Sequence, residues 1–333
     1  MKEINHGGDI YSQKIDLDFS VSINPLGMPR EVREAALEGV RLSEHYPDLI
    51  CRRLVRSLAE KYQLLGASIL VGSGAVELID AFCRTVHPMT VMTDAPTFTE
   101  YERASSCAWT PDPDQADLVC LCNPNNPTGS LRKKEELLRI TRNCLRGGTF
   151  VLVDESFLPF TGEGEENSML RETEHFPNLI VVRSFTKMYA MPGLRLGWAA
   201  VGNTHIKEKM EEMQPPWSVS IPAQMAGEAA LRLHGFEEMT RSYVRRERAL
   251  LTGSLRELSY VGSIFPSEAN YFLIKGPAGL DAALAKQRIL IRNCKDMRGL
   301  SREYFRISVK KREENLLLIN ELNKIENIYK QDN

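Results

Sequence analysis

Residues that could carry chemistry occur in four short motifs, each placed where an apolar segment ends. A lysine amine can form a Schiff base and then move protons, and a carboxylate can stabilise a positive charge next to it. A Gly-rich turn that opens a helix offers free backbone N–H groups to a phosphate. The motifs are Gly72-Ser-Gly-Ala-Val76, Asn123-Pro-Asn-Asn-Pro-Thr-Gly129, Asp154-Glu-Ser-Phe157, and Ser184-Phe-Thr-Lys187 leading to Pro192-Gly-Leu-Arg195.

Each motif also has a plainer interpretation when it stands alone. The Gly-rich segment at residues 72–76 could be a tight turn, and Asp154 could be a helix N-cap. Lys187 and Arg195 could belong to a solvated positive face. Only the combination of the motifs, in this order along the chain, argues for a site.

The elements that must position these motifs alternate along residues 69–201. Short β-branched runs alternate with longer helical patterns, which is typical of βαβ units in a mainly parallel sheet. The chemistry is then expected at the carboxyl edge of the sheet. The predicted strands are Val91–Thr93, Leu118–Cys122, Phe150–Val153, Leu179–Val182 and Gly197–Val201, and the predicted helices between them are Ala75–Val86 and Leu131–Cys144.

The flanking segments predict a smaller α+β unit. Helices followed by short strands suggest a separate layer, closed by the N-terminal arm. We expect a large domain over 46–234 and a small domain formed by 1–45 together with 235–333. The predicted elements are helices at Arg30–Leu42 and Cys51–Tyr62, a helix-rich stretch from Pro222 to Leu258, strands at Tyr271–Ile274, Ile289–Arg292 and Phe305–Val309, and a helix from Arg312.

The composition narrows the class of partner. With 43% hydrophobic and 26% charged residues and a net charge of −2, the 333-residue chain resembles ordinary soluble proteins. A chain without a basic stripe is not expected to bind nucleic acid, and one without a long apolar run is not expected to enter a membrane. We expect a small-molecule ligand and a cytoplasmic location.

Seven cysteines are scattered through predicted helices and strands, which fits reduced thiols. Cys120 and Cys122 would share one face of a strand. Core packing is favoured over metal binding for this pair, because no second Cys/His pair lies at a structural-zinc spacing. No metal is expected.

Taken together, the motifs resemble those of the fold-type I pyridoxal-phosphate enzymes, the aspartate-aminotransferase-like family. The matching order is a Gly-rich turn, N-P-x-N-P-T-G, D-E-x-[YF], S-x-[ST]-K and P-G-x-R-x-G. The resemblance covers essentially the whole chain. It implies an α/β fold with a mainly parallel seven-stranded sheet between helices, a smaller α+β domain, and pyridoxal 5′-phosphate as cofactor.

The resemblance also implies roles for individual residues. Lys187 would carry the cofactor as a Schiff base and then move protons, and Asp154 would keep the pyridine nitrogen protonated. Asn126 would bind the ring 3-oxygen and Phe98 would stack on the ring. The cofactor phosphate would be held by Gly74, Ala75, Val76, Ser184, Thr186 and Arg195.

Two further positions concern the cofactor. Tyr46 matches a tyrosine that reaches the cofactor phosphate of the partner subunit in dimers of this family, so a homodimer is expected. Phe157 stands where many relatives have a tyrosine. Asn126 would then contact the ring oxygen alone, which would raise the pKa of the Schiff base.

Within the family, the N-terminal arm is most similar to that of the threonine-phosphate decarboxylases. The histidinol-phosphate aminotransferases come second in this resemblance. The similarity lies in His6-Gly-Gly8 and Ser22-Ile-Asn-Pro-Leu-Gly27. It implies decarboxylation of O-phospho-L-threonine to (R)-1-aminopropan-2-yl phosphate in cobalamin biosynthesis. The alternatives are transamination of histidinol phosphate with 2-oxoglutarate, and a catalytically silent protein on the same fold.

Six residues are expected to bind this substrate. Arg306 is the candidate for the α-carboxylate, because a guanidinium fork fits a carboxylate. Arg292 is the candidate for the substrate phosphate, with His6, Gly7 and Asn24 closing over it and Asn126 nearby. Read without the resemblance, His6 would be a disordered terminus and Arg292 a surface arginine.

Overall fold

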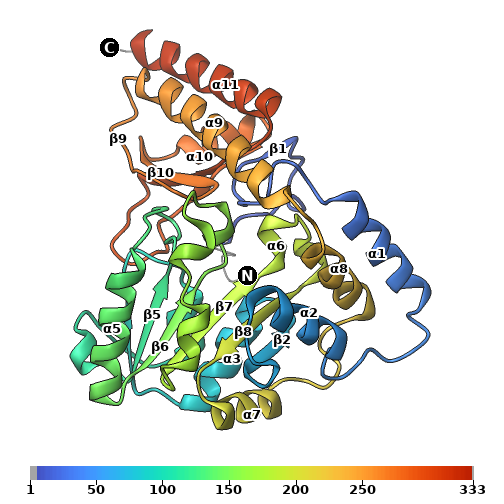
Figure 1. Cartoon of the computed structure of the whole chain (residues 1–333). Coiled ribbons are helices and arrows are strands. Elements are labelled where there is room, and N and C mark those ends of the chain that lie inside the picture. Colours follow the sequence, from blue (N-terminus) through green and yellow to red (C-terminus); the bar gives the residue numbers. More distant parts are fainter. Residues whose placement is uncertain (1–5, 332–333) are drawn as a thin grey trace.

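The computed structural model describes residues 6–331 as two sheets with helices packed around them (Figure 1). The larger sheet has seven strands, of which only β8 runs against the others. The fold class predicted from the sequence is therefore confirmed. In spatial order the strands are β2 (Ile69–Gly72), β8 (Gly197–Val201), β7 (Leu179–Ser184), β6 (Phe150–Asp154), β5 (Leu118–Cys122), β3 (Thr90–Thr93) and β4 (Ala108–Thr110).

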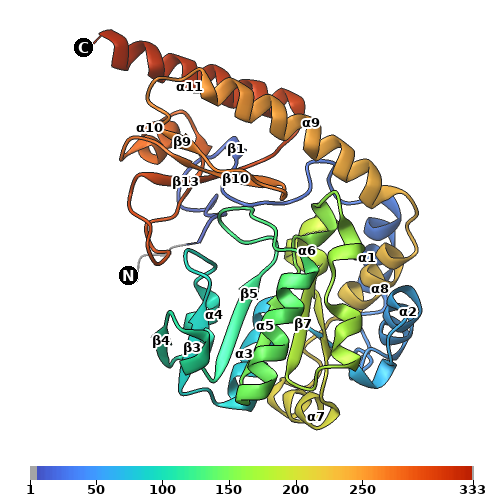
Figure 2. The same cartoon turned by 60° about the vertical axis from the view of Figure 1, so that its left-hand side comes forward.

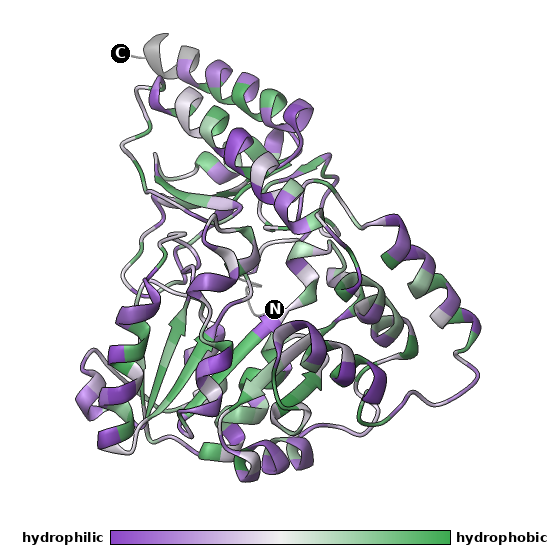
Figure 3. Cartoon of the chain, viewed as in Figure 1, coloured by the Kyte–Doolittle hydropathy of each residue, from purple (hydrophilic) through white to green (hydrophobic). Residues whose placement is uncertain are grey.

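Both faces of this sheet are buried, which explains why its strands are almost continuously apolar. Along β5, alternate residues enter two different apolar clusters: Val119 and Leu121 face one, and Cys120 and Cys122 face the other. The hydropathy colouring of Figure 3 shows the same pattern, with green along the strands and alternating colours along the helices. The two cysteines therefore pack in the core, and the described residues contain no group of three or more His, Cys, Asp or Glu that could hold a metal.

Helices cover the two faces. The faces are identified by the apolar clusters to which each helix contributes. One face is covered by α3 (Ala75–Val86) and α7 (Thr204–Met213), with α4 (Glu100–Ser105) near its edge; the other is covered by α2 (Arg52–Tyr62), α5 (Lys134–Gly147) and α8 (Ile221–Leu231).

Capping and close packing fix the ends and the neighbours of these helices. Asn203 and Ser220 accept hydrogen bonds from the first turns of α7 and α8 with their side chains. Helix α1 (Arg30–Arg41) lies against α8, where Gly39 approaches the backbone of Pro222 so closely that a Cβ would lie 2.6 Å from the proline Cα. The first predicted helix therefore packs on the large sheet's layer, and the domain boundaries at 45/46 and 234/235 stay a prediction.

The smaller unit lies above the carboxyl edge of the large sheet (Figure 2). Its helices α9 (Phe236–Arg256) and α11 (Arg312–Gln331) run side by side in both views, and α10 (Leu280–Lys286) lies beneath them. Its antiparallel sheet has the order β12 (Arg292–Asn293), β13 (Tyr304–Ser308), β10 (Tyr271–Lys275) and β9 (Ser263–Ile264), and a separate parallel pair joins β1 (Leu17–Asp18) to β11 (Ile289–Leu290).

The prediction of one strand over residues 289–292 was wrong. The chain forms two short strands there, because β11 pairs with the N-terminal arm whereas β12 pairs with β13. The start of the predicted helix at Leu131 was also early, since α5 begins at Lys134 after Lys133 in an extended conformation. No helix of residues 6–331 is long and apolar enough to span a membrane.

Candidate active site

A cavity of about 230 Å³ opens between the carboxyl edge of the large sheet and the smaller unit. The last residues of three neighbouring strands line it: Cys122, Asp154 and Ser184 end β5, β6 and β7. Most of the residues predicted for the site lie around this one cavity. These are His6, Gly7, Ala75, Val76, Phe98, Asn126, Asp154, Ser184, Thr186, Lys187, Arg195, Arg292 and Arg306.

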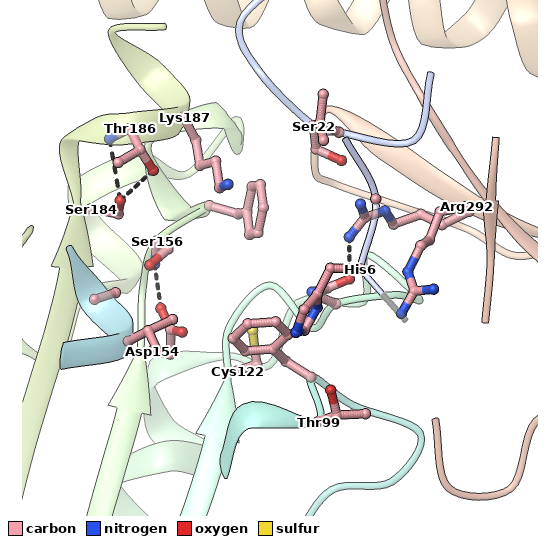
Figure 4. Close-up of a pocket in the computed structure, with 18 of the residues that line it drawn as sticks. His6, Ser22, Thr99, Cys122, Asp154, Ser156, Ser184, Thr186, Lys187 and Arg292 are labelled. Carbon is pink, nitrogen blue, oxygen red and sulfur yellow. Dashed lines mark hydrogen bonds between the residues drawn. The ribbon is translucent and has the colours of Figure 1, made fainter. Parts of the chain in front are cut away.

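The two kinds of predicted ligand lie on opposite sides of the cavity. In Figure 4, Ser184 and Thr186 lie on one side, His6 and Arg292 on the other, and the Lys187 side chain points into the space between them. This separation leaves room for two anionic groups at once, one at each side.

Lys187 lies in the short helix α6 (Phe185–Met188), directly after β7. The pKa of its amine is lowered to about 8, first by burial and then by the charges of Arg306 and Arg195, whereas Asp154 acts in the opposite direction. An amine with this pKa is partly neutral near neutral pH, as a nucleophile must be.

Asp154 is buried, and both of its oxygens accept hydrogen bonds. The Ser156 backbone N–H donates to Oδ1 at 2.9 Å, and the Tyr101 hydroxyl donates to Oδ2 at 2.8 Å. Burial and the neighbouring Asp154 raise the pKa of Tyr101, so the phenol keeps its proton and remains a donor. These two contacts fix the carboxylate at the base of the cavity.

A cradle for an anion is formed where α3 begins. Gly74 precedes the helix with φ 92°, and an added Cβ would lie 2.5 Å from Nη2 of Arg195. The Ala75 and Val76 residues of the first turn line the cavity next to the Ser184 and Thr186 hydroxyls, which are 2.6 Å apart. A helix N-terminus, two hydroxyls and a guanidinium are the donors that a phosphate monoester prefers.

The antiparallel direction of strand β8 explains why Lys187 and Arg195 line the same cavity. Because β8 is antiparallel to β7, Gly197 pairs with Ser184, and the segment between them turns back to the same edge of the sheet. Arg195 itself has φ 57°, which directs the chain from the turn into β8. One local hairpin therefore brings both the Lys187 amine and the Arg195 guanidinium to the same cavity.

Arg306 lies in β13 and is buried, with two of its nitrogens bound to the chain. Nη1 donates to Oδ1 of Asn126 at 2.6 Å, and Nη2 donates to the Ser20 carbonyl at 2.6 Å. The guanidinium lies 5.3 Å from the centre of the Tyr271 ring, and Nε has no hydrogen-bond partner. Because Asn126 accepts with its oxygen, its amide N–H₂ is left to donate.

The N-terminal arm reaches the cavity through His6 and Gly7. The His6 Nε2 lies 3.1 Å from Oε1 of the buried Glu100. Gly7 packs on Ser20, where an added Cβ would lie 2.9 Å from the carbonyl carbon and closer still to the oxygen. The Gly8 N–H donates to the Ser20 hydroxyl at 2.8 Å. The alternative interpretation of His6 as part of a disordered terminus therefore does not apply.

Helix α4 connects three parts of the site through three consecutive residues. Glu100 contacts His6 of the arm, Tyr101 donates to Asp154, and Glu102 accepts from Arg298 of the loop that follows β12. None of these three residues was predicted from the sequence to belong to the site.

Three predicted residues do not line the cavity. The expectation that Asn24 closes over the substrate was wrong, because its side chain is buried and donates to the Met188 carbonyl at 2.7 Å and to Thr240 Oγ1 at 2.9 Å. Gly74 lies behind the lining residues and acts through its backbone shape. Tyr46 is 78% exposed and packs on Trp217, so its predicted contact with a partner subunit stays a prediction.

Other side chains that line the cavity were missed or left aside. Ser22 shares a hydrogen bond of 2.8 Å with Ser308, and Met297 covers the cavity from the loop after β12. Ser22 opens the arm motif at residues 22–27 but was given no role there, and Met297 stands in no motif and lies at the cavity through tertiary structure. Phe157, the departure noted in the sequence, also lines the cavity and packs edge-on against Tyr271.

Comparison with known proteins agrees with this arrangement. The model of the family "Aminotransferase class I and II" matches residues 105–322.

The chain belongs to this family.

Membership confirms the expectation of pyridoxal 5′-phosphate as cofactor.

Individual relatives carry two different names. The chain is 34% identical to threonine-phosphate decarboxylase of Salmonella typhimurium, over 91% of this chain and 89% of that protein. It is 33% identical to histidinol-phosphate aminotransferase 2 of Archaeoglobus fulgidus, over 95% of this chain and 94% of that protein. The crystal structure of histidinol-phosphate aminotransferase from Clostridium acetobutylicum has a TM-score of 0.87 and 27% identity, and the match covers 94% of this chain and 99% of that one. Identity alone therefore does not separate the two activities.

Proposed function

We propose that this family member decarboxylates O-phospho-L-threonine to (R)-1-aminopropan-2-yl phosphate, a step of cobalamin biosynthesis. The observation that carries the proposal is that the N-terminal arm enters the cavity, where His6 and Gly7 lie with Arg292 on the side opposite the phosphate cradle. The similarity to the Salmonella decarboxylase supports the same activity. A substrate with a phosphate of its own needs such a second anion site.

The cofactor fits the residues that are present. Its phosphate would be held by the first turn of α3, the Ser184 and Thr186 hydroxyls and Arg195, in the space that Gly74 leaves free. Asp154 would hold a proton on the pyridine nitrogen, and Phe98 would cover the ring. When bound, pyridoxal phosphate withdraws the electron pair of the α-carbon bond that stands perpendicular to its ring.

The two arginines would decide which bond that is. Arg306, already fixed by Asn126 and Ser20, is the candidate for the α-carboxylate. Arg292 and His6 would hold the substrate phosphate and so fix the rotation about the α-carbon. With the phosphate held there, we expect the bond to the carboxylate to stand perpendicular and to break.

Lys187 would complete the reaction. The Cα–C bond breaks, its electron pair stays on the substrate, and carbon dioxide leaves. The Lys187 side chain, in its protonated ammonium form, would then deliver a proton to Cα and become the neutral amine, which restores four bonds at that carbon. Its position at the end of β7, between the two anion sites, suits this transfer.

The test is to mix the cofactor-loaded protein with O-phospho-L-threonine and to measure carbon dioxide and product. We expect release of carbon dioxide with the cofactor left in its starting form. Arg292→Ala should reduce the rate sharply, since a hydrogen bond to a charged group contributes roughly 1.5–3 kcal/mol, while the visible absorption of the bound cofactor stays. Conversion of the cofactor to the pyridoxamine form without carbon dioxide would exclude the proposal.

Transamination of histidinol phosphate is the second candidate, favoured by the match to the Clostridium structure. It would use the same phosphate site but would need a pocket for an imidazole. This candidate predicts rapid conversion of histidinol phosphate with 2-oxoglutarate. That outcome would replace the proposed reaction and leave the fold and the cofactor unchanged.

A further inference from the structure

Two arginines of the cavity lie directly opposite each other in the smaller sheet. Arg292 of β12 and Arg306 of β13 are register partners, and both line the cavity. Like charges that face each other across neighbouring strands destabilise the pair. Burial lowers the pKa of Arg306, and the charge of Arg292 acts in the same direction. Before a substrate arrives, the chain itself must therefore hold Arg292 in place.

Asp296 makes the contact that does this. Nη2 of Arg292 donates to both carboxylate oxygens, at 2.9 Å and 2.7 Å, and Nη1 donates to the Asn293 carbonyl at 2.8 Å. Both charged side chains are nearly buried, with 10% and 11% exposed, so salt screens the pair little. Arginine has five N–H groups, so these three contacts leave at least two for a ligand.

Asp296 approaches Arg292 from outside the cavity. Arg292 lines the cavity, whereas Asp296 does not. A phosphate in the cavity would therefore meet the free N–H groups of Arg292 rather than the carboxylate.

The loop that carries Asp296 is fixed at its far end. Arg298 donates to Glu102 of α4 at 2.6 Å and 3.1 Å, and its guanidinium lies 4.2 Å from the centre of the Trp109 ring. The segment from Arg292 to Arg298 thus connects the smaller sheet to the large one beside the cavity. The loop that carries Asp296 is therefore held at both ends.

We propose that Asp296 is a positioning residue that holds the Arg292 guanidinium beside Arg306, with its free N–H groups directed to the substrate phosphate. This inference rests on the proposed function, in which Arg292 binds that phosphate. Asp296 touches neither substrate nor cofactor. It acts on the substrate only through the position of Arg292.

The experiment measures binding of ethyl phosphate to the cofactor-loaded protein by isothermal titration calorimetry. Ethyl phosphate has no amine, and the cradle of α3 is filled by the cofactor, so it reports on the Arg292 side. Asp296→Ala should raise its Kd about tenfold, which corresponds to about 1.4 kcal/mol. Asp296→Asn keeps one acceptor oxygen and should recover at least half of that loss.

Kinetics give the second readout. For O-phospho-L-threonine, Asp296→Ala should raise KM in parallel with the Kd of ethyl phosphate and should also lower kcat, because the Arg292 contact fixes the rotation about the α-carbon in the proposed reaction. Asp16→Asn is the matched control, because Asp16 pairs with Arg288 at 2.6 Å and neither residue lines the cavity. This control should change neither value.

An unchanged or tighter Kd in Asp296→Ala would overturn the inference, and so would a weaker Kd that Asp296→Asn does not restore at all. The proposed function can fail separately. If the wild-type protein releases no carbon dioxide but Asp296→Ala still weakens ethyl phosphate binding, the reaction assignment is wrong and the role of Asp296 stands.

Discussion

At the scale of single residues, the amine of Lys187 has the property that is easiest to measure. Its pKa is lowered to about 8, first by burial and then by Arg306 and Arg195. Only the neutral amine attacks an aldehyde, so covalent capture of added cofactor by the cofactor-free protein should accelerate with pH. Below pH 8 the rate should rise about tenfold per unit, and above pH 8 it should level off. Stopped-flow absorbance measures this profile.

Two variants check the cause of this profile. Arg306→Gln removes a neighbouring positive charge and should move the midpoint to higher pH. Lys187→Ala should bind the cofactor without the absorption of the covalent link and should have almost no turnover. A midpoint near 10.5 in the wild-type protein, the usual lysine value, would contradict the effect of burial.

Most of the site could be predicted from the sequence because its residues stand in local motifs at strand ends. The exceptions have a common physical reason. Asn24 lies in a motif typical of the arm, but its side-chain amide donates hydrogen bonds to the Met188 carbonyl and the Thr240 hydroxyl. No local sequence pattern reveals these two contacts. Tyr101 and Asp296 act through Asp154 and Arg292, and a residue that acts through another leaves no motif of its own.

At the scale of elements, the N-terminal arm gives a sharp prediction. Gly7 lies against the Ser20 carbonyl, so Gly7→Ala would push the arm and His6 away from the cavity. The KM for a phosphorylated substrate should rise several-fold, about 1 kcal/mol for one displaced hydrogen-bonding group, with a smaller effect on kcat. Steady-state kinetics tests this.

Gly162→Ala is the matched control for the arm. Gly162 has no atom within 4 Å of an added Cβ, and the same substitution should leave KM unchanged. An equal KM in Gly7→Ala and the wild type would show that the arm does not contribute to binding.

Five of the seven strands of the large sheet could be predicted nearly to their ends, because burial on both faces makes them apolar and short, whereas β2 and β4 were not predicted as strands. Residues 289–292 were harder. Their apolar pattern is that of one strand, and only the arm, which pairs with Ile289 and Leu290, divides it in two. Pairing between distant segments is not encoded in a local pattern.

At the scale of the whole molecule, exposed apolar side chains gather on one side, over α1, the segment after it and the loop at Trp217. These residues are Leu37, Val40, Leu42, Tyr46, Leu49, Ile50 and Trp217. A patch of this kind marks an interface. We expect a two-fold symmetric dimer at micromolar concentration, with Tyr46 at the partner's cofactor phosphate.

Sedimentation velocity tests the dimer. Val40→Asp should shift the protein toward monomer and reduce activity together, whereas Met89→Asp, at an even more exposed apolar residue outside this patch, should not. Tyr46→Phe should keep the dimer and weaken cofactor retention by about 0.5–1.5 kcal/mol. A fully active monomer would exclude a shared site.

Helix α4 contacts the arm, Asp154 and the loop after β12 through Glu100, Tyr101 and Glu102. Contacts that share one short rigid element are energetically coupled, so their losses should not add. In a double-mutant cycle, His6→Ala and Arg298→Ala should show an interaction energy of about 0.5 kcal/mol or more for phosphate binding, although the two side chains lie on different segments. The arm, Asp154 and the loop after β12 would then respond together when an anion binds, and not as independent contacts.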